Sequence, residues 1–361
     1  MNKSIEKLSL FWYKFKKIIF VFIIIFFLVV NRIYIEKKNR VIYLYSSRNH
    51  YSNYTILKEK NSLLKYLSKR LKKKITHIES LFLDSFNNFG NQILTLNKAI
   101  FYCEILGCKN IILNEDYYWF MKNTINYTYK NNLTMTIETV DKKVYQNNTN
   151  VLFDHTNNYF VYYGRVRPQY RVDVIKNEIL MNLPKITVNT EDLFIYIRSG
   201  DIFEKTMRSY FQPPLCFYKA ILDNFIFENI YIISENKNNK LIDELLAQYP
   251  NIIYSQNSLK NDVSILAHSY NIVGGYTTFL KSIILLNNNL KKMWYFDFYV
   301  SPPDSYFFSY EFNHKNITIY KMKNKNYNYY NKIIKFHDLQ SQFNFMMNYD
   351  CRCNFTVINY I

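Results

Sequence analysis

An alternation of strand-like and helix-like segments between residues 193 and 298 restricts the possible folds of this chain most strongly. Short apolar runs typical of buried strands alternate with longer runs in which apolar residues recur every three or four positions, as on one helical face. The predicted strands are 193–198, 229–234, 251–255, 270–275 and 292–298, and the predicted helices are 214–225, 239–249, 262–269 and 277–286. Because strands that alternate with helices pair in parallel, this region predicts a doubly wound α/β sheet.

A second unit of this kind begins earlier in the chain. A strand-like run at 79–84 is followed by FNNFGNQILTLNKAIFYCEILGCKNIIL, residues 86–113. Gly107 lies where a left-handed helix cap is expected, and NIIL then predicts a buried strand. The apolar residues between the two glycines lie on one helical face: Ile93, Leu96, Ile100 and Cys103. Two such units predict two Rossmann-like domains that face a cleft.

The N-terminus carries an uninterrupted apolar run, Ile18 to Val30, with basic residues before it. The run is short for a membrane span, but residues up to 35 extend it through snorkelling ends. No small-residue cleavage site of a signal peptide follows. We therefore expect a cytosolic tail at 1–17 and an uncleaved transmembrane signal anchor at 18–35. The rest of the chain is then lumenal, as in a single-pass type II protein of the Golgi or endoplasmic reticulum.

Glycosylation sequons agree with a lumenal body, although so asparagine-rich a chain contains many by chance. In the predicted lumenal part, six sequons begin at Asn53, Asn126, Asn132, Asn147, Asn316 and Asn354.

The net charge of +18 does not predict a nucleic-acid binder. Lysine, asparagine, isoleucine and tyrosine are abundant along the whole chain, whereas a functional basic surface shows clusters. The one dense basic run, Lys65 to Lys74, lies in the polar segment 36–75, which we interpret as a stem.

The five cysteines include no CxxC pair, so a zinc site is not expected. Cys351 and Cys353 are too close in sequence to bridge each other without strain. One of them could bridge to another cysteine in an oxidising compartment, and the sequence leaves the connectivity open.

Three loops at predicted strand ends carry the residues suited to chemistry: Asn88–Gln92, Tyr196–Asp201 and Gly274–Phe279. In open α/β sheets, ligands bind outside the carboxyl ends of the strands, and a helix N-terminus offers free N–H groups to an anion. Thr277 and Thr278 could hold a phosphate, or they could act only as helix caps.

Arg198 follows a predicted strand and offers a planar fork of donors that suits a diphosphate. The alternative is a structural salt bridge to Asp201. The chain has no D-x-D motif of the kind that holds a divalent ion against a diphosphate, so we expect arginine and helix-end stabilisation without a metal.

In this order, the three loops resemble motifs of the fucosyltransferase superfamily, in particular the α1,2-fucosyltransferases and protein O-fucosyltransferases. NFGNQ resembles its GxxGNQ loop, YIRSGD its HxRRxD motif, and DVSILAHSYNIVGGYTTF its late D…L…A…(G/S)…STF segment. The resemblance covers residues 79–297. It implies a GT-B-like pair of domains, GDP-fucose as donor, inversion at the anomeric carbon and no metal cofactor.

The resemblance also implies roles for single residues. Arg198 matches the arginine that binds the β-phosphate and assists the leaving group, and Asp201 could fix its loop. Thr277 and Thr278 match hydroxyl groups near the diphosphate, and Asp262 matches an acidic residue near the nucleoside. Asn91, with Gly90, matches the loop beside donor and acceptor. Gly90 would allow close backbone approach, or form a simple turn. The family histidine is Tyr196 here and the second arginine is Ser199; no general base is assigned, and His155 is more typical of a structural or surface histidine.

The expected protein is a lumenal, membrane-anchored glycosyltransferase that moves fucose from GDP-fucose to a glycan or protein acceptor. Its expected parts are an acceptor domain at 76–190, a nucleotide-sugar domain at 191–300 and a C-terminal extension at 301–361. The alternative, which Tyr196 and Ser199 favour, is a catalytically inactive carbohydrate-binding or scaffold protein with the same fold.

Overall fold

The structure, a computed structural model, describes only part of the chain. The described residues are 60–61, 63–65, 68, 74, 76–83, 88–116, 118–129, 133–140, 151–154, 172–200, 212–275, 277–297, 316–323, 328–333, 335, 338–351 and 355–360. Residues 63–361 form one unit, separate from residues 1–62, and all elements below lie in it.

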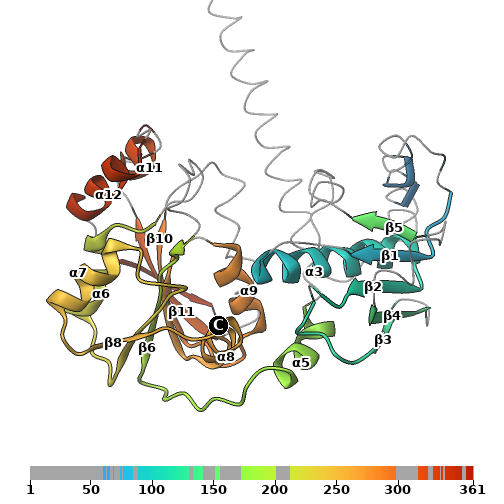
Figure 1. Ribbon diagram of the computed structural model, residues 1–361, viewed down its shortest axis with the longest axis horizontal. Helices are drawn as coiled ribbons and strands as arrows, with labels where there is room; N and C mark the ends of the chain where they lie inside the picture. Colours follow the sequence, from blue (N-terminus) through green and yellow to red (C-terminus); the bar gives the residue numbers. More distant parts are fainter. Residues whose placement is uncertain are drawn as a thin grey trace, which may run out of the picture. The chain divides into compact units, whose positions relative to one another are not determined.

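The N-terminal sheet is mainly parallel and has the strand order β3-β4-β2-β1-β5 (Figure 1). β1 pairs in parallel with β2 and β5, β2 pairs in parallel with β4, and β3 is antiparallel to β4. Helix α3 (Phe89–Leu106) joins β1 to β2 and ends at Gly107, whose φ of 76° is left-handed as predicted. The strands are β1 (Ser80–Leu83), β2 (Asn110–Asn114), β3 (Ile125–Tyr129), β4 (Leu133–Val140) and β5 (Val151–Asp154). The predicted β-α-β unit is confirmed.

The second sheet has the order β12-β11-β10-β9-β6-β7-β8, and only β12 is antiparallel to its neighbour. Its first five strands in the chain confirm the predicted ones: β6 (Leu193–Tyr196), β7 (Ile230–Ile233), β8 (Ile252–Ser255), β9 (Asn271–Gly274) and β10 (Lys292–Asp297). The connecting helices α6 (Leu215–Asn224), α7 (Lys240–Gln248), α8 (Leu259–His268) and α9 (Thr278–Leu286) also follow the sequence prediction.

Apolar side chains cover both faces of this sheet, which explains the continuous apolar runs of its strands. On β6, Phe194 belongs to the core that α8 and α9 line, whereas Leu193 and Ile195 belong to the core that α6 and α7 line. The first of these cores also contains residues of α3 and of the N-terminal sheet. The sheet is therefore doubly wound, and one core continues from it into the N-terminal sheet. A cleft between the two sheets stays a prediction.

The C-terminal segment, in which no helix or strand was predicted, completes the second sheet. It supplies β11 (Ile317–Lys323), α11 (Asn328–Ile333), α12 (Leu339–Asn348) and β12 (Phe355–Tyr360). Trp294 of β10 stacks on Tyr320 of β11, with ring centroids 4.9 Å apart. The extension is therefore an integral part of the second sheet.

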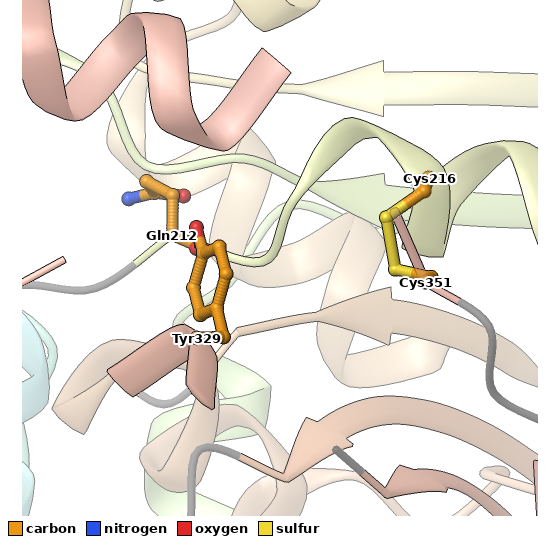
Figure 2. The surroundings of a disulfide bond; sticks show 4 residues. All are labelled: Gln212, Cys216, Tyr329 and Cys351. Atoms are coloured by element: carbon orange, nitrogen blue, oxygen red, sulfur yellow. A yellow bond between two sulfur atoms is a disulfide. The ribbon is translucent and has the colours of Figure 1, made fainter. Parts of the chain in front are cut away.

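A disulfide bond joins Cys216 of α6 to Cys351 beyond the end of α12 (Figure 2). Beside it, the Tyr329 hydroxyl of α11 donates a hydrogen bond to the Gln212 carbonyl oxygen at 2.7 Å. The bridge settles the connectivity of Cys351, while Cys353 lies outside the described residues. Cys103 and Cys108 are buried free thiols.

The predicted tail and anchor, residues 1–17 and 18–35, lie outside the described residues. Within the described part of the chain, no helix has the length and apolar character needed to cross a membrane. In the segment interpreted as a stem, Leu63 and Leu64 are helical and belong to the core of the N-terminal sheet, so the folded body starts before residue 76.

Two of the six predicted glycosylation sites lie in the described residues, and both are exposed: Asn126 on the edge strand β3, and Asn316 directly before β11. The other four, Asn53, Asn132, Asn147 and Asn354, lie outside them.

Candidate active site

Two of the three predicted loops meet where the strand order of the second sheet reverses. The chain leaves β6 toward β7 and β8 on one side, and later returns to β9, β10 and β11 on the other. β6 and β9 are adjacent and parallel, with Tyr196 opposite Gly274. Arg198 follows β6, and Thr277 follows β9 as the N-cap of α9. Such a switch point, at the carboxyl ends of the strands, is where open α/β sheets bind ligands.

The third loop reaches the same place because the first turn of α3 packs against the first turn of α9. A Cβ atom at Gly90 would lie 2.5 Å from the Phe279 nitrogen and 2.6 Å from the Thr278 carbonyl carbon. The Ser282 hydroxyl of α9 also donates to the Gly90 carbonyl oxygen at 2.9 Å. Gly90 thus lies inside α3 and not in a simple turn, and the backbone that it approaches closely is that of α9.

An aromatic contact connects all three loops. The ring of Phe279 lies 6.1 Å from that of Phe89 in α3 and 4.8 Å from that of Tyr196 in β6, measured between centroids. Tyr196 stands where the similar family has a histidine, and here it packs against the N-terminus of α9.

The contact between α3 and α9 gives a direct test. Gly90→Ala places a methyl group against the backbone of α9, so the helices must separate; overpacking of this kind costs about 1–3 kcal/mol. We expect a lower free energy of unfolding in urea. Gly274→Ala is the matched control, because its Cβ would meet a flexible side-chain end, Leu280 Cδ2 at 2.6 Å, and should cost less. If the two variants lose equal free energies of unfolding, the close contact of Gly90 with the α9 backbone has no special importance for stability, which would contradict this account.

Arg198 is 8% exposed and starts a turn that forms hydrogen bonds with the loop between β7 and α7. Its carbonyl oxygen accepts a hydrogen bond from Asn239 Nδ2 at 3.0 Å. The Ser199 hydroxyl donates to Asn236 Oδ1 at 2.6 Å, so the residue that replaces the family's second arginine has a structural contact here. Asp201, the predicted partner of Arg198, lies outside the described residues.

The two threonines differ in their surroundings. Thr277 Oγ1 accepts from the Leu280 N–H at 3.0 Å, which makes Thr277 the N-cap of α9, and its side chain is buried. A hydroxyl that accepts a capping bond still has its own proton to donate. Thr278 is the first residue of the helix and is half-buried. The capping interpretation thus holds for Thr277, and Thr278 is the better placed of the two to contact a ligand at the helix N-terminus.

Asp262 lies in the first turn of α8, which follows β8. Burial raises the pKa of its carboxyl group to about 6, although Asn257 Nδ2 donates to Asp262 Oδ1 at 3.1 Å and opposes the shift. One strand, β7, separates β8 from β6. Neighbouring strands lie about 4.8 Å apart, so the ends of β8 and β6 are roughly 10 Å apart. A nucleoside diphosphate is long enough to extend from one strand end to the other.

The raised pKa of Asp262 predicts a gain in stability when its charge is removed. The folded chain keeps this proton up to about pH 6, whereas the unfolded chain loses it near 3.8. The ionised group therefore destabilises the fold increasingly from pH 3.8 to 6, and fully above that. The penalty corresponds to about 3 kcal/mol. We expect Asp262→Asn to unfold at higher urea than the wild type at pH 7 and equally at pH 4. A loss of stability at pH 7 would contradict this account.

Asn91 is half-buried in the first turn of α3, and its Nδ2 donates to Asn88 Oδ1 at 3.1 Å. Asn88 is the N-cap residue, but its side chain does not cap the helix; its carbonyl oxygen accepts from the N–H groups of Asn91 and Gln92. Gln92, to which the sequence analysis gave no role, is buried, and its Oε1 accepts no hydrogen bond from any described residue. Only its place in the NFGNQ motif marked it beforehand.

The described residues contain no group of three His, Cys, Asp or Glu side chains that could hold a metal ion. His155 lies outside the described residues.

No model of a known protein family matches the chain, and no curated protein matches its sequence. The solved structures that are similar to it include three of fucosyltransferases. A selenomethionine form of fucosyltransferase NodZ from Bradyrhizobium shares 8% identity over 59% of this chain and 93% of its own, with a TM-score of 0.32. A second structure of that enzyme shares 7% identity over 68% of this chain and 96% of its own, with a TM-score of 0.30. The structure of NodZ alpha-1,6-fucosyltransferase co-crystallised with GDP shares 9% identity over 69% of this chain and 96% of its own, with a TM-score of 0.29.

Proposed function

We propose that this protein is a glycosyltransferase that transfers fucose from GDP-fucose to a glycan or protein acceptor, with inversion and without a metal ion. The observation that carries the proposal is the meeting of three loops at one switch point: the first turn of α3, the turn after β6 and the first turn of α9. These loops hold Arg198, Thr277 and Thr278, which the resemblance assigns to the donor diphosphate, although the loops are far apart in the sequence.

The proposed donor site follows the edge of the second sheet. The diphosphate lies at the N-terminus of α9, where Thr278 and the first backbone N–H groups face it, and Arg198 holds phosphate oxygens from the end of β6. The nucleoside extends toward Asp262 at the end of β8. As the sugar–phosphate bond breaks, the charge on the leaving GDP is stabilised by the arginine and the helix end, which replaces a metal ion.

The cellular setting is part of the proposal. A disulfide between Cys216 and Cys351 is typical of proteins in an oxidising compartment, and the exposed sequon residues Asn126 and Asn316 are accessible to glycosylation. These features support a lumenal body behind the type II anchor predicted at 18–35, in the Golgi or endoplasmic reticulum. The acceptor then docks on the N-terminal sheet and its loops.

A non-catalytic carbohydrate-binding or scaffold protein is the second candidate. Two contacts favour it: Tyr196 packs on Phe279, and Ser199 is bound to Asn236, so neither supplies the charged group that the similar family has at that position.

Donor hydrolysis distinguishes the two candidates. We expect purified protein lacking residues 1–35 to hydrolyse GDP-fucose in preference to other sugar nucleotides, with the same rate in excess EDTA. Binding of GDP-fucose without turnover would favour the second candidate. Activity that EDTA abolishes and manganese restores would contradict the metal-free mechanism.

Thr278 tests the role of the α9 N-terminus. Thr278→Val removes a hydroxyl that does not cap the helix, so we expect a donor KM raised by a factor of about 5–10, the value of one hydrogen bond, with an unchanged melting temperature. Thr278→Ser, which keeps the hydroxyl, should behave like the wild type. Thr277→Val instead removes a cap and should lower stability by about 1 kcal/mol. An unchanged KM in Thr278→Val would show that this hydroxyl does not contact the donor.

A further inference from the structure

The turn that carries Arg198 is held by the loop between β7 and α7. The Asn239 Nδ2 group, fully buried, donates to the Arg198 carbonyl oxygen at 3.0 Å. Asn236 Oδ1 accepts from the Ser199 hydroxyl at 2.6 Å. The third residue of the turn, Gly200, has a left-handed φ of 71°, and a Cβ there would lie 2.5 Å from Glu235 Oε2. Arg198 and Ser199 thus form hydrogen bonds with residues 235–239, and Gly200 lies close to the Glu235 side chain.

These contacts begin where the strand ladder stops. The last ladder bond of β6 runs from the Ile197 N–H to the Ile233 carbonyl oxygen at 3.1 Å. Beyond it, the direction of the chain at Arg198 depends on the side chains of the neighbouring loop. That loop has its own supports, because Asn236 Oδ1 also accepts from the Asn238 N–H and the Ser234 hydroxyl donates to the Asn236 carbonyl oxygen, both at 3.0 Å.

We propose that Asn239 is a positioning residue that sets the orientation of Arg198 toward the donor diphosphate. The inference rests on the proposed function, since Arg198 acts there on the leaving group. Asn239 uses both halves of its amide: Nδ2 holds the Arg198 carbonyl, while Oδ1 accepts from the Leu241 N–H at 3.1 Å and caps α7. An amide side chain carries its donor and its acceptor on separate atoms, so Asn239 can make both bonds at once.

The two functions of Asn239 can be separated by one substitution. Asn239→Asp keeps the capping oxygen, and aspartate and asparagine cap helices about equally well. It removes the N–H donor and points a carboxylate oxygen at the Arg198 carbonyl, which displaces the turn. Asn287→Asp is the matched control. Asn287 is also fully buried, and its Nδ2 donates to the Leu266 and Ser269 carbonyl oxygens at 2.8 Å, but it lies at the C-terminal end of α9, whereas the proposed diphosphate site is at the N-terminal end.

The experiment measures kcat and donor KM for GDP-fucose hydrolysis, together with amide hydrogen exchange of residues 193–200. A small displacement of a catalytic group can cost up to about 100-fold in rate. We expect Asn239→Asp to lower kcat by about 10- to 100-fold with a KM within threefold of the wild type, and to speed exchange at Ser199 and Gly200. Asn287→Asp should change neither kcat nor the exchange at Ser199 and Gly200, even if its melting temperature falls as far as that of Asn239→Asp.

A kcat for Asn239→Asp within twofold of the wild type, or an equal fall in both variants, would overturn the assignment. Hydrogen exchange needs no turnover, so it decides the point even for a protein that hydrolyses no sugar nucleotide. Unchanged exchange at Ser199 and Gly200 in Asn239→Asp would then reject the positioning role, while the lack of turnover would reject the proposed function separately.

Discussion

Replacing Arg198 by lysine is expected to lower kcat for fucosyl transfer by about 10²–10³, or about 3–4 kcal/mol, with a smaller rise in donor KM. Negative charge grows on GDP as the sugar–phosphate bond breaks. A planar guanidinium can hold two phosphate oxygens and gains strength as that charge develops, whereas lysine keeps the charge but loses the two-point geometry. Arg198→Ala should reduce kcat at least as much.

Stability measurements on the same preparations distinguish this role from a structural one. The contact that the structure shows for the Arg198 backbone, from Asn239 to the carbonyl oxygen, survives any change of the side chain. For a catalytic role, we expect the fall in kcat to persist at temperatures well below the melting temperature of each variant. If Arg198 is instead a salt-bridge partner of Asp201, both variants should melt earlier, and Asp201→Asn should match them. A folded Arg198→Ala protein with full activity would refute the catalytic assignment.

The second large effect is expected at the disulfide. Cys216 and Cys351 are 135 residues apart, so the bridge removes much of the freedom of the unfolded chain. The chain-entropy model gives about 5 kcal/mol for such a loop, and measured losses on removing a native disulfide are about 2–5 kcal/mol. We expect the double variant Cys216→Ser, Cys351→Ser to lose stability in this range in urea unfolding.

Reductant provides the control for this variant. Dithiothreitol should destabilise the wild type to the level of the double variant, and should leave the double variant itself unchanged. A double variant as stable as the oxidised wild type would contradict a bond between these two cysteines. The other cysteines in the described residues, Cys103 and Cys108, are free thiols and stay the same in both proteins.

The parts of the fold that could be predicted from the sequence are those encoded by local periodicity. Strands β6, β7, β9 and β10 are buried on both faces and are therefore continuous apolar runs, and Gly107 ends α3 as its position in the pattern indicates. β11 and β12 were missed because tyrosine, lysine and asparagine interrupt their apolar positions. Their burial depends on partners such as Trp294, which a local pattern does not contain.

The candidate site also contains features that could be predicted from local sequence and features that could not. The helix start at Thr277 and Thr278 is encoded locally, by a glycine pair followed by capping residues. The partner of Gly90 is not encoded locally, because Ser282 lies 192 positions further along the chain. The contacts of Ser199 with Asn236 and of Arg198 with Asn239 also join separate loops, and only the strand order brings these loops together.

The central claim is that the switch point between β6 and β9 binds the diphosphate of a guanosine nucleotide. Calorimetric titration of GDP into the wild type and into Arg198→Ala tests it most directly, because binding needs neither an acceptor nor turnover. The account predicts saturable binding of GDP to the wild type, and binding at least about tenfold weaker to Arg198→Ala, since a charge-assisted hydrogen bond contributes about 1.5–3 kcal/mol. No binding to the wild type, or equal affinities for the two proteins, would contradict it.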